Sequence, residues 1–364
     1  MKPEYTDHVD VVPVMRPRLP VSDQVVGYLR GMDASRVYSN FGPLSVELER
    51  RYAERFNVPA SRVATCSSAT LGLQGAVQGL PSGRVHCPTF TFAATPMAIV
   101  NAGREVVFHD VRADDWQLVD INPQGDDAVM PVLPFGAEIE VGRWSAWEHC
   151  VVDAAASGGA SHRDLSWLPA GWSVALSLHA TKVLGIGEGG VVIFGSDDAA
   201  ERFRSFTSLG FVDRRASDIR GTNAKLPEPS AAYALAALDL WEVEELEWRA
   251  ARALTCAAER SLGLSAACSD NPGVSPYWLV RFADDDTLRR AEASMARAGI
   301  ESRRWWPESC DRMGAFSDFA RVGGFPVADS LAGTVLGLPF FRDITSGDVQ
   351  RVVDAVTRAL EERP

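Results

Sequence analysis

Short apolar runs that alternate with helix patterns constrain the fold of this chain more than any other feature of its sequence. The runs lie at Val63–Cys66, Glu105–Asp110, Ala128–Leu133, Cys150–Asp153, Ser173–Leu178 and Gly190–Phe194. Helix patterns or loops separate most of them, starting with an amphipathic pattern at Leu44–Phe56 and a helix pattern that opens at Ser68. Buried strands joined by helices are typical of a mostly parallel sheet that is covered on both faces. The sequence therefore predicts an α/β fold.

The C-terminal part of the sequence predicts a second, smaller lobe. A long run of strong helix formers extends from Ser230 to about Leu262 and carries the chain into this lobe. The elements expected after it are a strand at Tyr277–Phe282, a helix at Asp286–Ala298 and a final helix at Ser346–Glu361. We expect a large α/β domain over residues 1–240, which begins with an extended, proline-bearing segment, and a small α+β domain over residues 241–364.

The charge balance and the cysteine spacing argue against several classes of protein. The chain of 364 residues has 36 Lys and Arg against 48 Asp and Glu, so its net charge of −12 leaves no general basic surface for nucleic acid. Its six cysteines form no CxxC pair and its histidines are scattered, so we expect neither a bound metal nor a disulfide framework. No apolar run approaches the roughly 18 residues of a membrane span. We expect a soluble, cytoplasmic protein without nucleic-acid or membrane partners.

Lys182 is the residue with the most direct chemical implication. It follows an apolar run and directly precedes a glycine-rich stretch at residues 185–190. A lysine among small and apolar neighbours loses its proton at modest cost, and the neutral amine can form a Schiff base with an aldehyde cofactor. Most lysines beside glycine-rich turns are nevertheless solvated surface residues. The stretch fits G-x-G-x-x-G, but it leads into the strand-like run Val191–Phe194 instead of a helix, which argues against a nicotinamide dehydrogenase.

Residues at two predicted strand ends and one aromatic residue could also bind an aldehyde cofactor. Ser68, Ala69 and Thr70 open a helix, whose backbone N–H groups and hydroxyls suit a phosphate, although Ser and Thr are also ordinary helix caps. Asp153 ends a buried-looking strand, where α/β sheets bind ligands, although it could equally cap the next turn. A buried carboxylate at that place would keep a pyridine ring protonated. Phe92 could stack on a flat ring or pack in the core.

The order of phosphate seat, aromatic, aspartate and lysine resembles that of fold-type-I pyridoxal-phosphate (PLP) enzymes. More narrowly, nearly the whole chain resembles the DegT/DnrJ/EryC1/StrS family of sugar aminotransferases. The matching motifs are Ser39–Pro43 with Glu47 and Glu49, Ser68–Thr70, Pro88–Thr95, Pro131–Leu133, Asp153–Ala155, Ser177–Lys182, Gly187–Gly190, Gly221–Asn223 with Glu228 and Ala231–Ala232, and Leu338–Pro339. The resemblance implies a large domain with a mostly parallel sheet between helices, followed by a smaller C-terminal α+β domain.

The resemblance also implies roles for the matched residues. Lys182 would be the Schiff-base lysine and proton carrier, and Asp153 would contact the pyridine nitrogen. The implied cofactor-binding residues are Ser68, Ala69, Thr70, Phe92, Asp153, Ala155, Ser177, Lys182 and Asn223. Asn223 would reach the cofactor phosphate of a partner subunit, which implies a homodimer with shared active sites. The candidate substrate residues are His179, Arg214, Arg215, Arg220, Lys225, Arg303, Arg304 and Trp306.

The reaction implied by the resemblance is the transfer of an amino group to a nucleotide-linked keto-deoxy sugar in amino-sugar biosynthesis. The donor would be an amino acid, by family analogy glutamate. A PLP-dependent sugar dehydratase of the same fold would have a histidine in place of Lys182, which disfavours that alternative. The chain departs from the family at Ala156, at Ala69 and at Trp305-Trp306, where the family usually has Gln or His, Gly, and His-Tyr. Ala156 keeps open a catalytically idle protein that binds cofactor or sugar nucleotide.

Overall fold

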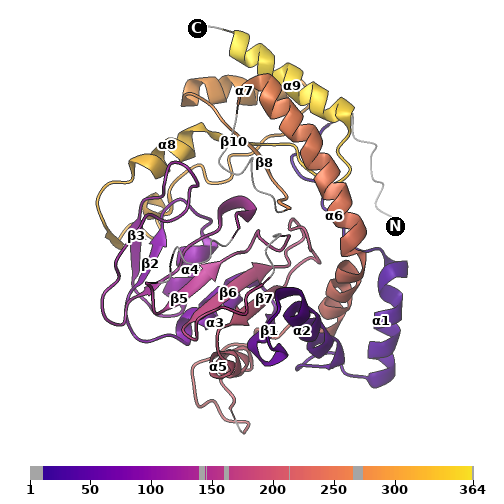
Figure 1. Cartoon of the computed structure of the whole chain (residues 1–364), viewed down its shortest axis with the longest axis vertical. Coiled ribbons are helices and arrows are strands. Elements are labelled where there is room, and N and C mark those ends of the chain that lie inside the picture. The colour runs from indigo at the N-terminus through magenta and orange to yellow at the C-terminus, as the bar shows by residue number, and fades with distance from the viewer. Residues whose placement is uncertain are drawn as a thin grey trace.

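A computed structural model describes residues 11–138, 144, 146–159, 164–212, 214–264 and 274–362 of the chain. At its centre, the described residues form an eight-stranded sheet (Figure 1). Its strands, in spatial order, are β1 (Val63–Cys66), β7 (Gly190–Phe194), β6 (Trp172–Ser177), β5 (Cys150–Asp153), β4 (Ala128–Val129), β2 (Val85–Pro88), β3 (Val106–His109) and β9 (Ala320–Arg321). β7 is antiparallel to both of its neighbours, and every other described pair is parallel. The predicted α/β fold with a mostly parallel sheet is confirmed.

Helices surround this sheet, and a second, two-stranded sheet lies in the C-terminal lobe. The described helices are α1 (Ser22–Ser35), α2 (Pro43–Phe56), α3 (Ala69–Gln78), α4 (Ala94–Asn101), α5 (Asp197–Thr207), α6 (Glu228–Leu262), α7 (Asp285–Arg297), α8 (Pro326–Thr334) and α9 (Ser346–Glu361). The second sheet pairs β8 (Trp278–Arg281) with β10 (Val335–Leu338) in antiparallel orientation. Within the described ranges, no helix combines the length and the apolar character that crossing a membrane requires.

The large sheet is buried on both faces, as its continuous apolar strands lead one to expect. In β7, Val191 and Ile193 belong to the core on one face, whereas Val192 and Phe194 belong to the core on the other. Helices α2 and α6 contribute side chains to the first core, and α3, α4 and α5 contribute to the second. Because side chains alternate along a strand, helices on both faces bury every residue of such a run.

The C-terminal part of the chain packs against the large sheet as well as within its own lobe. Helix α6 runs across residue 240, and β9 pairs in parallel with the edge strand β3 of the large sheet. At the other end of the chain, Val12 forms a parallel bridge with Ile300 in the C-terminal lobe. The division into domains at residue 240 stays a prediction. The β9–β3 pairing and the Val12–Ile300 bridge both connect residues on opposite sides of this boundary.

Three predicted strands and one predicted helix match the structure residue for residue, namely β1, β5, β7 and α9. Two other predictions need correction. Of the predicted strand Ala128–Leu133, only Ala128–Val129 forms a ladder, because Pro131 has no backbone N–H to donate. Beyond Pro131 the segment pairs again, through the parallel bridge between Val132 and Asp153. The expected extended start contains α1 instead, whose buried side chains are Val25 and Met32 alone, too few for a clear helical pattern.

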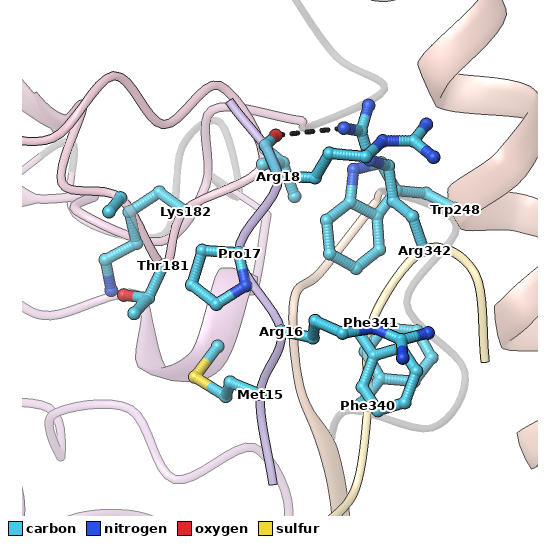
Figure 2. A pocket seen from close by; sticks show the side chains of 12 residues that line it. Met15, Arg16, Pro17, Arg18, Thr181, Lys182, Trp248, Phe340, Phe341 and Arg342 are labelled. Carbon is cyan, nitrogen blue, oxygen red and sulfur yellow. Dashed lines mark hydrogen bonds between the residues drawn. The ribbon is translucent and has the colours of Figure 1, made fainter. Parts of the chain in front are cut away.

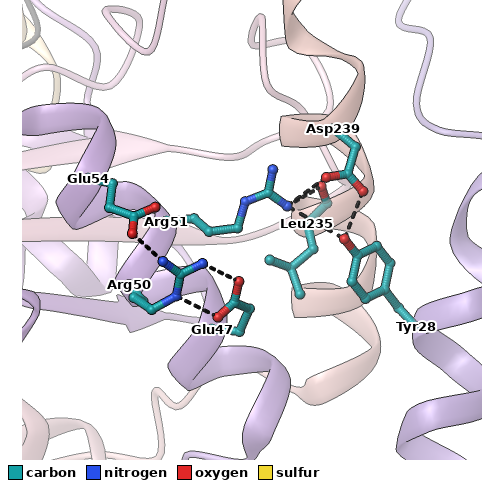
Figure 3. A network of polar contacts seen from close by, with 7 residues as sticks. All are labelled: Tyr28, Glu47, Arg50, Arg51, Glu54, Leu235 and Asp239. Atoms are coloured by element: carbon teal, nitrogen blue, oxygen red, sulfur yellow. Dashed lines mark hydrogen bonds and ion pairs between the residues drawn. The ribbon is translucent and has the colours of Figure 1, made fainter.

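A polar network fastens α1 and α2 to α6 (Figure 3). Arg51 of α2 donates a hydrogen bond of 2.7 Å to Asp239 of α6, and the Tyr28 hydroxyl of α1 donates another of 2.7 Å to the same carboxylate. Burial raises the pKa of Tyr28, and the neighbouring Asp239 raises it further. On the adjacent surface of α2, Arg50 bridges Glu47 and Glu54. The Asp239 contacts connect the three helices, whereas the exposed Arg50 pairs lie within α2 and contribute little to stability.

Glu228, at the start of α6, is a fully buried carboxylate that caps α2. It accepts hydrogen bonds from the backbone N–H groups of Leu44 at 2.8 Å and Ser45 at 2.9 Å, and from the Ser45 hydroxyl at 2.6 Å. A Cβ atom at Gly42 would lie 2.6 Å from the Glu228 carboxyl carbon, so glycine is required there. The carboxylate also faces the positive end of the α2 dipole.

We expect Glu228→Gln to lower the free energy of unfolding by about 1–3 kcal/mol, because the amide cannot accept all three hydrogen bonds and turns a donor toward backbone N–H groups. Urea unfolding followed by circular dichroism measures the change. The exposed substitution Glu54→Gln on the same helix is the control, with an expected loss below about 1 kcal/mol. Equal losses in the two variants would contradict the capping role.

A buried histidine pair joins β2 and β3. His86 Nδ1 lies 2.8 Å from His109 Nε2, and His86 Nε2 lies 3.1 Å from a carboxylate oxygen of Asp127. Burial, with a smaller contribution from His86, lowers the pKa of His109 to about 4. The folded protein therefore favours a neutral His109, whereas an unfolded histidine titrates near pH 6.5.

The stability that neutral His109 contributes should be complete above about pH 6.5 and should be lost as the pH falls toward 4. Its size is at most about 3 kcal/mol, the free energy that corresponds to the shift in pKa. The measurement is urea unfolding of the wild type and of His109→Gln at pH 7 and pH 4.5. The variant should lose less stability between these two pH values, and parallel losses would show that His109 is not responsible.

Candidate active site

The carboxyl ends of β1, β5 and β6 meet at one edge of the large sheet. The register aligns Cys66 of β1 and Ser177 of β6 with Gly190 of β7, which lies between them. A Cβ atom on Gly190 would lie 2.8 Å from the backbone nitrogen of Ala69, so the absence of a side chain lets the start of α3 approach β7. The predicted phosphate-binding residues Ser68–Thr70 and Ser177 are thereby brought to the same edge.

Hydroxyl groups and a helix N-terminus make this edge suitable for an anion. Ser68 is the N-cap of α3, and its hydroxyl oxygen accepts the N–H of Leu71 at 3.3 Å. The helix-capping alternative therefore holds for Ser68, while the first N–H groups of α3 still point out of the helix end. The Ser177 hydroxyl oxygen accepts the N–H of His179 at 3.2 Å, which leaves its hydrogen available to donate.

Asp153, the last residue of β5, is a buried carboxylate at the same edge. It is 6% exposed, and it accepts hydrogen bonds from Thr95 at 2.7 Å and from the Ala155 N–H at 3.2 Å. Burial raises the pKa of Asp153, although both hydrogen bonds and the charge of Lys182 act in the opposite direction. The two donors leave a lone pair on each oxygen, so the carboxylate can still receive a cationic N–H group.

Two buried threonines, neither of which was predicted from the sequence to have a role, orient this carboxylate. Thr95 uses its only hydroxyl hydrogen on Asp153, so it must accept the hydrogen of Thr91, whose oxygen lies 2.8 Å away. Both residues follow β2 and have almost no exposed surface. The i, i+4 spacing of the two threonines at a helix start was the available signal. The pair holds one carboxylate oxygen of Asp153 in a fixed direction.

Lys182 lies in the turn after β6, and its amine has a partner from the C-terminal lobe. Its Nζ atom donates a hydrogen bond of 2.8 Å to the hydroxyl of Tyr277, a residue that the sequence analysis did not select. The turn is closed by hydrogen bonds from the Lys182 N–H to His179 and from the Gly185 N–H to Lys182. The aspartate and the lysine predicted from the sequence therefore lie at the same edge of the sheet, close enough for electrostatic coupling.

Aromatic side chains surround this part of the edge. The Trp306 ring stacks on Phe135 with a centroid distance of 4.2 Å and meets Phe90 edge-on at 4.8 Å. Phe92 is 64% exposed, so the core-packing alternative does not hold, and its ring is accessible just before α4, the helix that carries Thr95. The predicted contact of Trp306 with the substrate stays a prediction.

The predicted substrate cations are not gathered at Lys182. Arg304 is neutralised by Asp285 and Glu292, each at 2.7 Å, so its role in the structure is to hold α7. Arg214 pairs with Asp218 at 3.0 Å on the surface. Lys225 Nζ donates a hydrogen bond of 2.6 Å to Asn223 Oδ1, and the Arg303 guanidinium lies over the Trp305 ring at 4.9 Å. His179 Nδ1 lies 2.9 Å from the Thr181 hydroxyl, and its Nε2 lies 3.8 Å from Glu188. Arg215 and Arg220 are exposed.

The N-terminal segment lines a small pocket beside the lysine turn (Figure 2). Met15–Arg18 runs between Thr181 and Lys182 on one side and Phe340–Arg342 on the other. The Arg342 guanidinium donates to the Arg18 carbonyl at 2.9 Å, and the Arg16 guanidinium lies 4.2 Å from the centre of the Phe341 ring. The segment therefore connects the surroundings of Lys182 with the C-terminal lobe.

Comparison with known proteins agrees with this geometry. The model of the DegT/DnrJ/EryC1/StrS aminotransferase family matches residues 22–357. This chain belongs to that family. It is therefore a member of a family of PLP-dependent sugar aminotransferases, and the resemblance inferred from the sequence motifs is confirmed.

Relatives with assigned activities cover most of the chain. The dTDP-3-amino-3,4,6-trideoxy-alpha-D-glucose transaminase of Streptomyces venezuelae is 31% identical over 78% of this chain and 79% of its own length. The dTDP-4-amino-4,6-dideoxy-D-glucose transaminase of Shigella dysenteriae is 25% identical over 94% of this chain and 97% of its own length. The crystal structure of DesI with its TDP-sugar product superposes with a TM-score of 0.83, at 26% identity, and covers 96% of this chain and 93% of DesI.

The residues at the sheet edge fit the cofactor of the family. Asp153 retains lone pairs for a protonated ring nitrogen, and the start of α3 offers N–H groups to a phosphate. Lys182 supplies an amine on the same edge. Among the described residues, no group of three or more His, Cys, Asp or Glu side chains is arranged to hold a metal ion. The individual cofactor-binding roles stay predictions.

We expect Thr95→Val to weaken the binding of PLP about 10-fold, because the buried Asp153 carboxylate loses a donor that favours its charged form. The measurement is an absorbance titration of the cofactor-free protein with PLP. Thr95→Ser retains the hydroxyl and is the matched control, which should bind within about 3-fold of the wild type. Wild-type affinity in the valine variant would show that Thr95 does not support the cofactor through Asp153.

Proposed function

We propose that this protein transfers an amino group from an amino acid, with glutamate as the donor, to a nucleotide-linked keto-deoxy sugar. The observation that carries the proposal is the presence of the Lys182 amine and the buried Asp153 carboxylate at one sheet edge in a member of this family. Its relatives from Streptomyces venezuelae and Shigella dysenteriae are named for dTDP-linked amino-deoxy sugars. The product would serve amino-sugar biosynthesis.

In this proposal Lys182 and Asp153 divide the chemical work. Lys182 would hold the cofactor through its amine. Once that amine is free, its Nζ atom would move the proton between the α-carbon of the donor and the aldehyde carbon of the cofactor. Asp153 keeps the pyridine nitrogen protonated. The bound cofactor supplies an electron sink that makes the α-carbon proton acidic. The buried Thr95 and Thr91 hold the carboxylate in place for this task.

The remaining cofactor contacts come from the sheet edge and from a second subunit. Ser68, Ala69, Thr70 and Ser177 would bind the phosphate, while Phe92 and Ala155 would lie against the ring. Asn223 would reach the phosphate in the partner subunit of a homodimer. Support for a covered surface near Asn223 comes from three exposed apolar side chains in the preceding segment, Leu209, Val212 and Ile219, which are 45%, 49% and 37% exposed.

The nucleotide diphosphate of the acceptor requires cations in a protein whose net charge is −12. Arg214, Arg215, Arg220 and Lys225 lie in the same segment as Asn223, and we assign this role to them as a group. Arg304 is excluded from the group because two carboxylates already neutralise it. His179 and Trp306 are the candidates for contacts with the sugar.

An absorbance spectrum before and after glutamate tests cofactor, lysine and donor together. The wild type with PLP should show a visible band that glutamate bleaches, whereas Lys182→Ala should show no borohydride-trapped adduct. The chain has only three lysines, at positions 2, 182 and 225, so peptide mapping of the trapped wild type gives an unambiguous assignment. Lys225→Ala is the matched control and should retain the band.

Each other outcome has a defined meaning. A visible band that does not respond to glutamate would contradict the proposed donor but not the cofactor site. Turnover in Lys182→Ala would contradict the mechanism. The absence of a band after addition of PLP would favour the idle binding protein that Ala156 left open.

A further inference from the structure

We propose that Tyr277 is the positioning residue of Lys182: its hydroxyl holds the released amine in a fixed direction between the steps of the reaction. This inference rests on the proposed function and adds a residue to it. The Lys182 Nζ atom lies 2.8 Å from the Tyr277 hydroxyl oxygen and 5.3 Å from the centre of its ring. The two residues are 95 positions apart, in the turn after β6 and directly before β8.

The ring of Tyr277 is immobilised by two aromatic neighbours. Phe135 meets it edge-on, with 5.3 Å between ring centroids and an interplanar angle of 81°. Trp305 meets it edge-on as well, at 5.0 Å and 85°. Such edge-to-face pairs are favourable geometries for aromatic rings. The phenol therefore cannot turn away from Lys182 without losing both contacts.

The backbone that carries Tyr277 is also fastened to the sheet edge. The Ser275 hydroxyl donates a hydrogen bond of 2.6 Å to the Phe135 carbonyl and accepts the Tyr277 N–H at 3.3 Å. Phe135 adopts a left-handed backbone conformation with φ of 53°, which is rare for a bulky residue. A Cβ atom on the following Gly136 would lie 3.1 Å from Ser275. Strain of this kind persists where the surrounding contacts enforce it.

The chemistry of the pair suits an amine that alternates between bound and released states. A phenol hydroxyl accepts an N–H from the ammonium form of lysine, and it can also exchange hydrogen bonds with the neutral amine. A released lysine side chain has a flexible four-carbon stem, and without a partner its amine would sample many directions. Holding it at one hydrogen-bond distance keeps the nitrogen near the atoms that it must attack or protonate. Tyr277 thus acts through Lys182 and need not touch the sugar.

The test compares Tyr277→Phe with Tyr28→Phe, which also removes one tyrosine hydroxyl and its 2.7 Å hydrogen bond but lies between α1 and α6. Full-length protein without cofactor is mixed with PLP, and the growth of the visible band gives the rate at which Lys182 captures the aldehyde. We expect capture to be roughly 10- to 100-fold slower in Tyr277→Phe and within about 2-fold of the wild type in Tyr28→Phe. With sugar acceptor, kcat should fall by a similar factor while KM stays unchanged.

Wild-type rates of capture in a folded Tyr277→Phe would overturn the inference and leave the proposed function intact. A wild type that forms no band with PLP would overturn the proposed function and this inference together. If Tyr277→Phe does not fold, Ser275→Ala provides the test, because it keeps the phenol but removes its backbone anchor. Slower capture in that variant would support the positioning role, and unchanged capture would overturn it.

Discussion

The buried carboxylate of Asp153 is the group around which the active-site edge is organised. A charge with so little access to water is tolerated only where hydrogen bonds and an opposite charge compensate for the loss of hydration. Three segments meet this requirement: the start of α4 through Thr95, the turn after β5 through the Ala155 N–H, and the turn after β6 through Lys182. The carboxylate therefore connects these three segments, and the same arrangement leaves it lone pairs for a cationic ring nitrogen.

The scarcity of lysine in this chain is an independent argument for a chemical role of Lys182. Of 36 basic residues only the lysines at positions 2, 182 and 225 are not arginine, so arginine accounts for the other 33. Arginine supplies the cation in the surface ion pairs of Arg50 with Glu47, Arg51 with Asp239 and Arg214 with Asp218. A guanidinium stays protonated and cannot become a nucleophilic amine, whereas a lysine can. Position 182 is thus one of the few places where the chemistry of an amine, and not only a positive charge, is available.

The sequence predicted those parts of the fold and site that depend on local pattern. The ends of β1, β5 and β7 could be predicted from their short buried runs, and Asp153 is the last residue of β5. Lys182 follows the apolar run that contains β6. The edge-to-face packing of Tyr277 could not be predicted, because it brings together Phe135 and Trp305, which are far from Tyr277 or from each other in the sequence. The ion pairs of Arg304 with Asp285 and Glu292 of α7 also depend on tertiary packing, so they could not be predicted either. Helix α1 was missed because it owes its packing to α6 and not to a strong pattern of its own.

The lysine turn contacts two segments that both connect to the C-terminal part of the chain. On one side its amine binds Tyr277, which immediately precedes β8, and on the other its backbone borders the N-terminal segment that is fastened to Arg342. Both connections end in the same lobe, and both meet the large sheet at the turn after β6. Asp153, in contrast, has its side-chain hydrogen-bond partners at the start of α4 and in the turn after β5. Asp153 and Lys182 are thus held by different parts of the chain: Asp153 by segments that flank the large sheet, and Lys182 by contacts with Tyr277 and the N-terminal segment.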